Sequence, residues 1–244
     1  MSKPQQIRDH IAYFLQEAVK AYEIDGVCDR LGMPVVADGA KPRIVVSDAL
    51  NNTIDIVEGA ERCLVYDRPL PPDGLTWTEL LSWWASIQSI TDDRAAATAL
   101  YKRLFSSLAS PPEELLFRTY CERYADGSAD VPALIPQVYL HYNPYTAREL
   151  AAMNATQLPR QRMDFLLLPG ERTRVVIEVD GKQHYSTDDG IASPSLYADM
   201  VREDRRIRLG GYEVFRFGGA ELQGKAGEQL VRGFFDELLR RTKP

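Results

Sequence analysis

Hydrophobic positions follow a helical period in the first hundred residues. Residues 4–24 place apolar side chains three and four positions apart, which predicts an amphipathic helix ended by Asp25-Gly26. The segments 27–34 and 76–90 predict two further helices. We therefore expect residues 1–107 to form a small, mostly helical N-terminal domain.

The rest of the chain combines helical and β patterns. Ser110 is expected to cap a helix over 111–124, with Glu113 and Glu114 at the positive end of its dipole. Strands are predicted at 134–142, 163–168, 174–179 and 212–217, and helices at 197–209 and 226–241. This order predicts an α/β fold, a mixed sheet flanked by helices, in a second domain of residues 108–244.

Strand periodicity places acidic side chains together. Glu178 and Asp180 share one face with Val176, because successive side chains of a strand alternate. A symmetric hairpin through the loop 169–173 pairs residues whose numbers sum to 342, which sets Asp164 opposite Glu178. A slip of one residue would separate the two carboxylates and also invert the apolar faces, so the facing register is favoured.

Composition and charge limit the function classes. The 244 residues are 45% hydrophobic and 26% charged, as in an ordinary globular protein, and no apolar run of about 18 residues could cross a bilayer. The N-terminus has no signal-peptide pattern, so we expect a cytoplasmic protein that does not enter membranes. The net charge of −6 argues against a nucleic-acid partner. Residues 160–244, however, hold 15 Lys or Arg against 14 Asp or Glu, so this part of the chain is nearly neutral and remains compatible with nucleic-acid binding.

The run VVIEVDGKQHY, residues 175–185, ends an apolar strand in four ionisable side chains: Glu178, Asp180, Lys182 and His184. A single acid at a strand end is usually solvated or paired, and a single His is usually structural. Two carboxylates opposed on one face repel each other. A hard divalent cation such as Mg²⁺ binds oxygen ligands and would reduce this repulsion. The grouping of these residues with Asp164 therefore predicts a metal site.

Asp164, Glu178 fourteen residues later and Lys182 close behind resemble the PD-(D/E)XK nuclease superfamily. The runs RMDFLLL, RVVIEVDGKQHY and REDRRIRLGGYEVFRF resemble, more closely, the bacterial domains related to very-short-patch mismatch repair endonucleases. The resemblance covers about residues 110–240. It implies a restriction-endonuclease-like fold, bound Mg²⁺ or Mn²⁺ and phosphodiester hydrolysis.

The resemblance assigns roles to individual residues. The metal ligands are expected to be Asp164 and Glu178, with Asp180 as a third oxygen donor because it shares a strand face with Glu178. The superfamily has Lys two residues after the acid, where this chain has Asp180; reading Asp180-Gly181-Lys182 restores the spacing but moves the acid. In the very-short-patch branch a His just past the strand takes part in catalysis, which favours His184. Whether Lys182 or His184 assists the attacking water stays open, since Lys could supply charge near the phosphate and His could act as general base.

Further residues are expected around this site. Glu114 and Gln183 are taken as auxiliary residues. In the helix 197–209, an inward stripe is marked by Tyr197, Met200, Val201 and Ile207. Asp204 lies within that stripe, and a buried pair with a neighbouring Arg is favoured over a direct role. Three arginines of this helix lie off the stripe: Arg202, Arg205 and Arg206. They could contact phosphate or form a solvated basic face, and the sequence favours neither interpretation.

We therefore expect a Mg²⁺-dependent endonuclease, a hydrolase acting on DNA, with phage defence or repair as the associated processes. The alternative is a catalytically silent nucleic-acid-binding or adaptor domain that keeps the nuclease fold. A protein partner could bind the N-terminal domain. DNA against RNA, strand form, sequence specificity and oligomeric state stay open at this stage.

Overall fold

The computed structural model describes residues 35–37, 43–48, 53–58, 63–66, 68, 70–71, 73–124, 130–139, 162–170, 173–187 and 189–242. The chain divides into two compact units, residues 1–69 with 138–162 and residues 70–137 with 163–244. The helices predicted at 4–24 and 27–34 lie outside the described residues.

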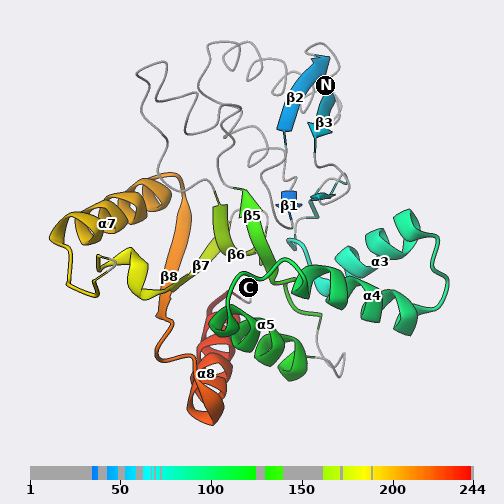
Figure 1. Ribbon diagram of the computed structural model, residues 1–244. Coiled ribbons are helices and arrows are strands. Elements are labelled where there is room, and N and C mark those ends of the chain that lie inside the picture. The colour runs from blue at the N-terminus through cyan, green and yellow to red at the C-terminus, as the bar shows by residue number, and fades with distance from the viewer. Residues whose placement is uncertain are drawn as a thin grey trace. The chain divides into compact units, whose positions relative to one another are not determined.

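The described part of the first unit consists of strands. β1 (Val35–Ala37) pairs antiparallel with β4 (Cys63–Val65), and β2 (Arg43–Asp48) pairs antiparallel with β3 (Thr53–Glu58) (Figure 1). The sequence analysis predicted a mostly helical N-terminal domain and did not predict these strands. Their short runs RIVVSD and TIDIVE are rich in Val, Ile and Thr, which favour β structure.

Two predicted N-terminal helices belong to the second unit, so the division differs from the expected boundary at residue 107. They are α3 (Trp77–Gln88) and α4 (Asp93–Phe105). Tyr101 of α4 stacks on Phe117 of the following helix, with ring centroids 5.6 Å apart. A local pattern shows that a helix is amphipathic but not which element it packs against, and here the partner comes later in the chain.

From α3 onwards the elements follow the predicted order along the chain. After α3 and α4 come α5 (Pro111–Tyr124), β5 (Ile135–Tyr139), β6 (Arg162–Leu167), β7 (Arg174–Asp180), the 3₁₀ turn η2 (Lys182–His184), α7 (Pro194–Leu209), β8 (Tyr212–Gly218) and α8 (Gly224–Thr242). The strands lie in the order β5-β6-β7-β8, antiparallel between β6 and β7 and parallel between β7 and β8. The fold is therefore mixed α/β, with a four-stranded mixed sheet flanked by helices among the described elements (Figure 1).

Helices cover both faces of this sheet. On one face, Phe165 of β6 stacks on Phe117 of α5 at 6.4 Å, and Phe215 of β8 meets Phe234 of α8 at 5.2 Å. Glu178 and Arg216 lie on the other face, because side chains alternate along β7 and β8. α7 covers that second face through an ion pair between its Asp204 and Arg216.

The predicted hairpin register is confirmed. Phe165 pairs with Ile177, Leu166 with Val176 and Leu167 with Val175, and the two numbers of each pair sum to 342. The predicted strands 163–168 and 174–179 agree with β6 and β7 to within a residue at each end.

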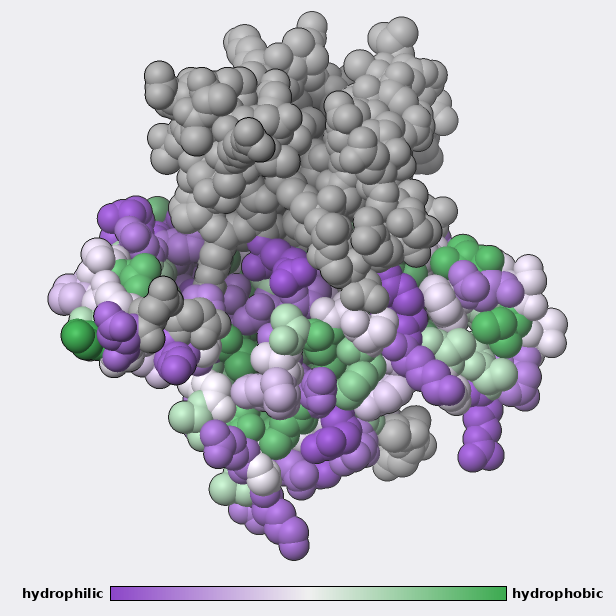
Figure 2. All heavy atoms as spheres, viewed as in Figure 1, coloured by the Kyte–Doolittle hydropathy of each residue, from purple (hydrophilic) through white to green (hydrophobic). Residues whose placement is uncertain are grey.

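Hydrophilic side chains gather over the visible face of α7 in Figure 2. Two exposed apolar residues flank this surface, Ile191 in the loop before α7 and Leu209 at the end of the helix. None of the described helices is long and apolar enough to cross a membrane.

Two glycines give a matched test of how the hairpin is held. Gly74 has a φ of +86°, and a Cβ there would overlap the carbonyl oxygen of Leu168, which accepts a hydrogen bond from Leu75 N at 2.9 Å. Gly190 has a φ of +77° and open space around it. We expect Gly190→Ala to destabilise by about 1 kcal/mol through backbone strain alone. Gly74→Ala should cost about 1–3 kcal/mol more because of the overlap. Urea unfolding followed by circular dichroism measures both, and equal losses would contradict the packing described here.

Candidate functional site

Three strands bring ionisable side chains to one face of the sheet. Leu166 and Val176 are directly paired, so Asp164 and Glu178, each two residues towards the same end, share their face. Arg216 is the in-register neighbour of Glu178 on β8 and therefore lies on this face too.

The two facing carboxylates are held differently. Asp164 is half-buried, and its Oδ2 accepts a hydrogen bond from the backbone N–H of Val179 at 2.8 Å. This bond holds the Asp164 carboxylate against β7 at the residue that follows Glu178. Glu178 is only 2% exposed. A carboxylate this deep costs free energy unless positive charge or hydrogen bonds compensate it.

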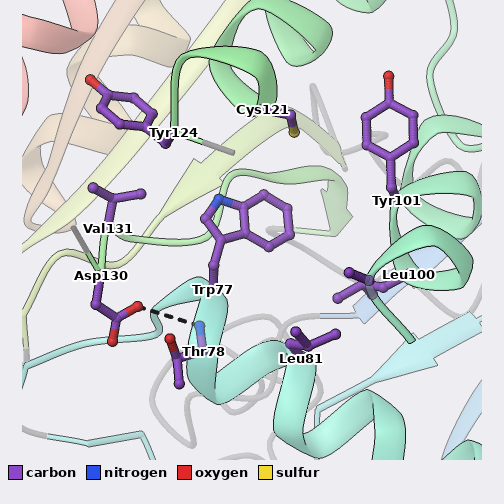
Figure 3. Close-up of a pocket in the computed structure, with 10 residues that line it drawn as sticks. Trp77, Thr78, Leu81, Leu100, Tyr101, Cys121, Tyr124, Asp130 and Val131 are labelled. Carbon is purple, nitrogen blue, oxygen red and sulfur yellow. Dashed lines mark hydrogen bonds between the residues drawn. The ribbon is translucent and has the colours of Figure 1, made fainter. Parts of the chain in front are cut away.

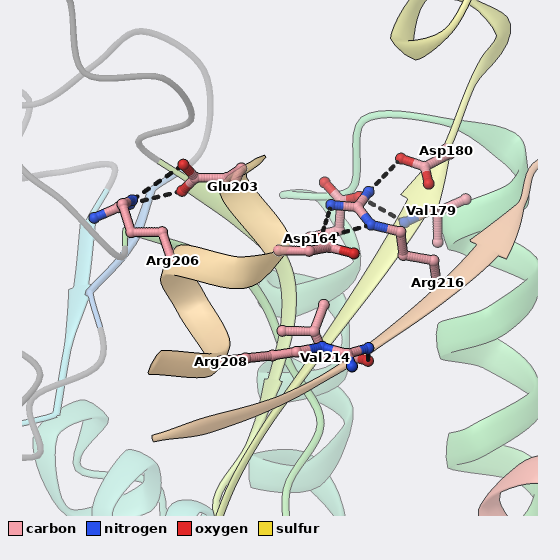
Figure 4. Close-up of polar contacts among 9 residues, drawn as sticks. Asp164, Val179, Asp180, Glu203, Arg206, Arg208, Val214 and Arg216 are labelled. Carbon is pink, nitrogen blue, oxygen red and sulfur yellow. Dashed lines mark hydrogen bonds and ion pairs between the residues drawn. The ribbon is translucent and has the colours of Figure 1, made fainter. Parts of the chain in front are cut away.

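Arg216 is the centre of a buried ion-pair network (Figure 4). Its Nη1 donates to Asp180 Oδ1 at 2.7 Å, and its Nε and Nη2 donate to Asp204 Oδ1 at 2.9 and 2.6 Å. Burial works against the charged form of Arg216, but the hydrogen bonds to Asp204 and Asp180, with the charges of Asp180 and Glu178, raise its pKa above the usual range. The guanidinium is therefore firmly charged.

Of the three predicted metal ligands, Asp180 takes part in this network. Asp180 is bound to Arg216, whereas Asp164 and Glu178 lie on neighbouring strands beside it. Mg²⁺ commonly binds one or two carboxylates and completes its shell with water and phosphate oxygens. Asp164 and Glu178 therefore supply donors that fit such an ion. Within the described residues, no group of three or more His, Cys, Asp and Glu side chains is arranged to hold a metal.

Sequence reasoning missed Arg216. The available signal was its place in the strand YEVFRF, where alternation puts Arg216 on the same face as the buried Val214. An Arg at a core-facing strand position requires an acidic partner. Asp204 does pair with an arginine, as was favoured from the sequence. The partner is Arg216, which lies on β8 and not on the same helix.

The turn η2 carries the other predicted catalytic residues. It begins two residues after Asp180, and the backbone N–H of His184 donates to Gly181 O at 3.0 Å. Lys182 is exposed and His184 is half-buried. Both are thus attached to the end of β7, close in the chain to the carboxylates. Gln183 lies in the same turn, and its side chain is outside the described part of the structure.

The arginines of α7 differ in their surroundings. Arg202 pairs with Asp199 at 2.6 Å, and Arg206 forms two hydrogen bonds to Glu203 at 2.6 and 3.0 Å (Figure 4). Arg205 is exposed. The Arg205 side chain has no ion pair to another described residue, so the phosphate-binding role stays a prediction to which Arg205 could contribute without breaking such a pair.

The inward stripe of α7 is rotated from the predicted one. Ile207 is buried as expected, and Met200 and Val201 are half-buried, but Tyr197 is 57% exposed and Glu203 is buried instead. The bidentate pairing with Arg206 lets Glu203 occupy an interior position, which hydrophobic periodicity alone does not show.

The N-terminus of α5 buries Glu113, not the predicted auxiliary residue Glu114. Glu113 Oε1 accepts from Ser110 Oγ at 2.8 Å, and its Oε2 accepts from Ala109 N at 3.0 Å and from Gln137 Nε2 at 2.6 Å. With the bond from Glu113 N to Ser110 Oγ at 3.5 Å, the contacts to Ser110 and Ala109 form a variant of the capping box in which the glutamate accepts from Ala109 N and not from the N-cap N–H. Glu114 is half-buried beside a surface pocket that Arg118 also lines.

A separate apolar cavity of about 400 Å³ lies among α3, α4 and α5 (Figure 3). Trp77, Tyr101 and Val131 are among its lining residues, which do not include the carboxylates described above. Burial, with a smaller effect of the Glu122 charge, raises the pKa of the Cys121 thiol in its wall to about 12. The thiol is therefore neutral and unreactive near pH 7.

Comparisons of the chain with protein-family models, with curated proteins and with solved structures found no match.

Adjacent acids on α5 allow a controlled test of the capping contacts. Glu113→Gln should destabilise the protein by about 1–3 kcal/mol, because the substituted amide NH₂ cannot accept the bonds that the carboxylate accepts. Glu114→Gln removes the same charge from the same helical turn and should change stability by less than about 0.5 kcal/mol. Urea unfolding of both variants measures the difference. Equal stabilities would mean that the bonds of Glu113 contribute nothing beyond its charge.

Proposed function

We propose that this protein is a metal-dependent nuclease that hydrolyses phosphodiester bonds of DNA at the site on β6, β7 and η2. The observation that carries the proposal is the register of three strands, which sets Asp164 beside Glu178 on one face next to buried Arg216. The turn that bears Lys182 and His184 follows directly.

Asp164 and Glu178 would hold the ion. A bound Mg²⁺ or Mn²⁺ lowers the pKa of a coordinated water and neutralises charge that develops on a phosphoryl group. The hydrogen bond from Val179 N orients the Asp164 carboxylate before any ion arrives. Such preorganisation lowers the reorganisation required on binding.

His184 and Lys182 would have different roles in the reaction. His184 is the favoured acceptor of the proton released by the attacking water, because an imidazole titrates near neutral pH. The water oxygen forms the new bond to phosphorus as one ester P–O bond breaks. Lys182 is exposed and can place its ammonium beside a phosphate oxygen without burying the charge.

Two further observations support the nuclease proposal. The resemblance to very-short-patch-like domains rests on motifs whose order along the chain agrees with β6, β7, α7 and β8. The exposed Arg205 on α7 adds positive charge at the covering helix of the same face.

A catalytically silent nucleic-acid-binding domain is the second candidate. The observation that favours it is the pairing of Arg216 with Asp180, since a protein cation already neutralises part of the acidic cluster. A domain of this kind would bind nucleic acid with no dependence on divalent ions and would not cleave it.

The nuclease proposal is tested by neutralising each predicted ligand. Asp164→Asn and Glu178→Gln should each reduce cleavage to background, while DNA binding stays the same or strengthens because one negative charge fewer repels phosphate. Glu237→Gln is the control, since it neutralises an exposed acid on α8. The assay incubates supercoiled, linear and single-stranded DNA, and RNA, with Mg²⁺, with Mn²⁺ and with chelator. Wild-type cleavage rates in both ligand variants would exclude this site.

Substitutions of His184 and of Lys182 should change the kinetics of cleavage in different ways. His184→Ala should lower the cleavage rate by about 10²-fold or more and remove the limb of the rate–pH profile that reports the free imidazole. Lys182→Ala should mainly weaken DNA binding and leave the shape of the profile intact. If Lys182→Ala alone abolished that limb, the two roles would be reversed.

A further inference from the structure

Two carboxylates from different elements meet at one guanidinium. Asp180 ends β7 and Asp204 lies within α7, and Arg216 binds a single oxygen of each, at 2.7 Å and at 2.6 and 2.9 Å. All three side chains are largely buried, with the Arg216 side chain 15% exposed. Such an arrangement of convergent carboxylate oxygens is also what a divalent cation requires.

The local charge favours a cation at this position. Asp164, Glu178, Asp180 and Asp204 contribute four negative charges and Arg216 one positive charge, a formal sum of −3 for these five side chains. The bonds of Arg216 go to Asp180 and Asp204, whereas Glu178 acts on it through its charge. The guanidinium is thus bound to one pair of acids, Asp180 and Asp204.

We propose that Arg216 takes the place of a second metal ion, so that its guanidinium occupies Asp180 and Asp204 and a divalent ion binds only at Asp164 and Glu178. The ion at Asp164 and Glu178 rests on the proposed function. The occupation of Asp180 by Arg216 rests on the observed bonds. Asp180 is then a positioning residue and not a metal ligand.

The chemistry of arginine suits this role. Its guanidinium stays charged, and its planar donors can bind carboxylates on two sides at once. A Lys ammonium at the same position would offer a point charge without this fixed geometry. Removal of the guanidinium takes away the donor that Asp180 and Asp204 share, and their carboxylate oxygens would then bind a divalent ion with water completing its shell.

The test counts bound Mn²⁺ by electron paramagnetic resonance at saturating concentration. Folded Arg216→Met should bind one Mn²⁺ more per chain than the wild type, and its melting temperature should rise more steeply with Mn²⁺. The double variant Arg216→Met with Asp180→Asn should return to the wild-type count. Arg240→Met is the control, because it removes an arginine paired with Glu237 at 2.6 Å on the exposed side of α8.

The possible outcomes separate this inference from the proposed function. One ion in the wild type and two in Arg216→Met support both. No ion in the wild type and one in Arg216→Met support the role of Arg216 and contradict a metal-dependent nuclease. Equal counts in the two folded proteins overturn the role of Arg216.

A second variant decides the question if Arg216→Met does not fold. Asp180→Asn is nearly isosteric and leaves Arg216 bound to Asp204. The inference requires this variant to bind the same number of Mn²⁺ ions as the wild type when both are saturated. Loss of an ion from Asp180→Asn would make Asp180 a ligand and overturn the inference.

Discussion

Several carboxylates can lie on one buried face of this sheet because a guanidinium lies among them. Arg216 joins the end of β7 to the middle of α7 through Asp180 and Asp204. Breaking a buried pair of this kind by removing one partner typically costs about 3–5 kcal/mol, because an uncompensated charge remains. α7 depends on the pair in particular, since Ile207 and Glu203 are its only buried residues. The covering helix is therefore attached largely by polar contacts.

The sequence was sufficient to predict the hairpin and its register. The strand period of two fixes which residues share a face, and a one-residue slip would have turned the apolar side chains of β6 and β7 outward. The same constraint predicted that Asp164 and Glu178 share one face, and the paired Leu166 and Val176 confirm that placement. Local rules succeeded here because a short loop joins the two strands.

Interactions between distant segments were not predictable by the same rules. Asp180 looked like a third ligand because its acidic neighbour is two residues away, but its partner Arg216 lies 36 residues further along the chain. The burial of Glu113 beside the predicted auxiliary residue Glu114 was not predictable for a similar reason, since Gln137, which binds Glu113, lies on β5. Helix periodicity also misplaced Tyr197, because a bidentate pair with Arg206 lets Glu203 take an interior position. In each case a side-chain pairing outweighed a local preference.

We propose that Asp164 and Glu178 together bind the divalent cation of this face. The most direct test is an anomalous difference map of wild-type crystals grown with Mn²⁺ and measured at the manganese absorption edge. We expect a peak within about 2.0–2.3 Å of a carboxylate oxygen of both residues, as is usual for an ion of this size with oxygen ligands. A map with no peak at these carboxylates, or with manganese only at exposed acidic side chains elsewhere, would contradict it.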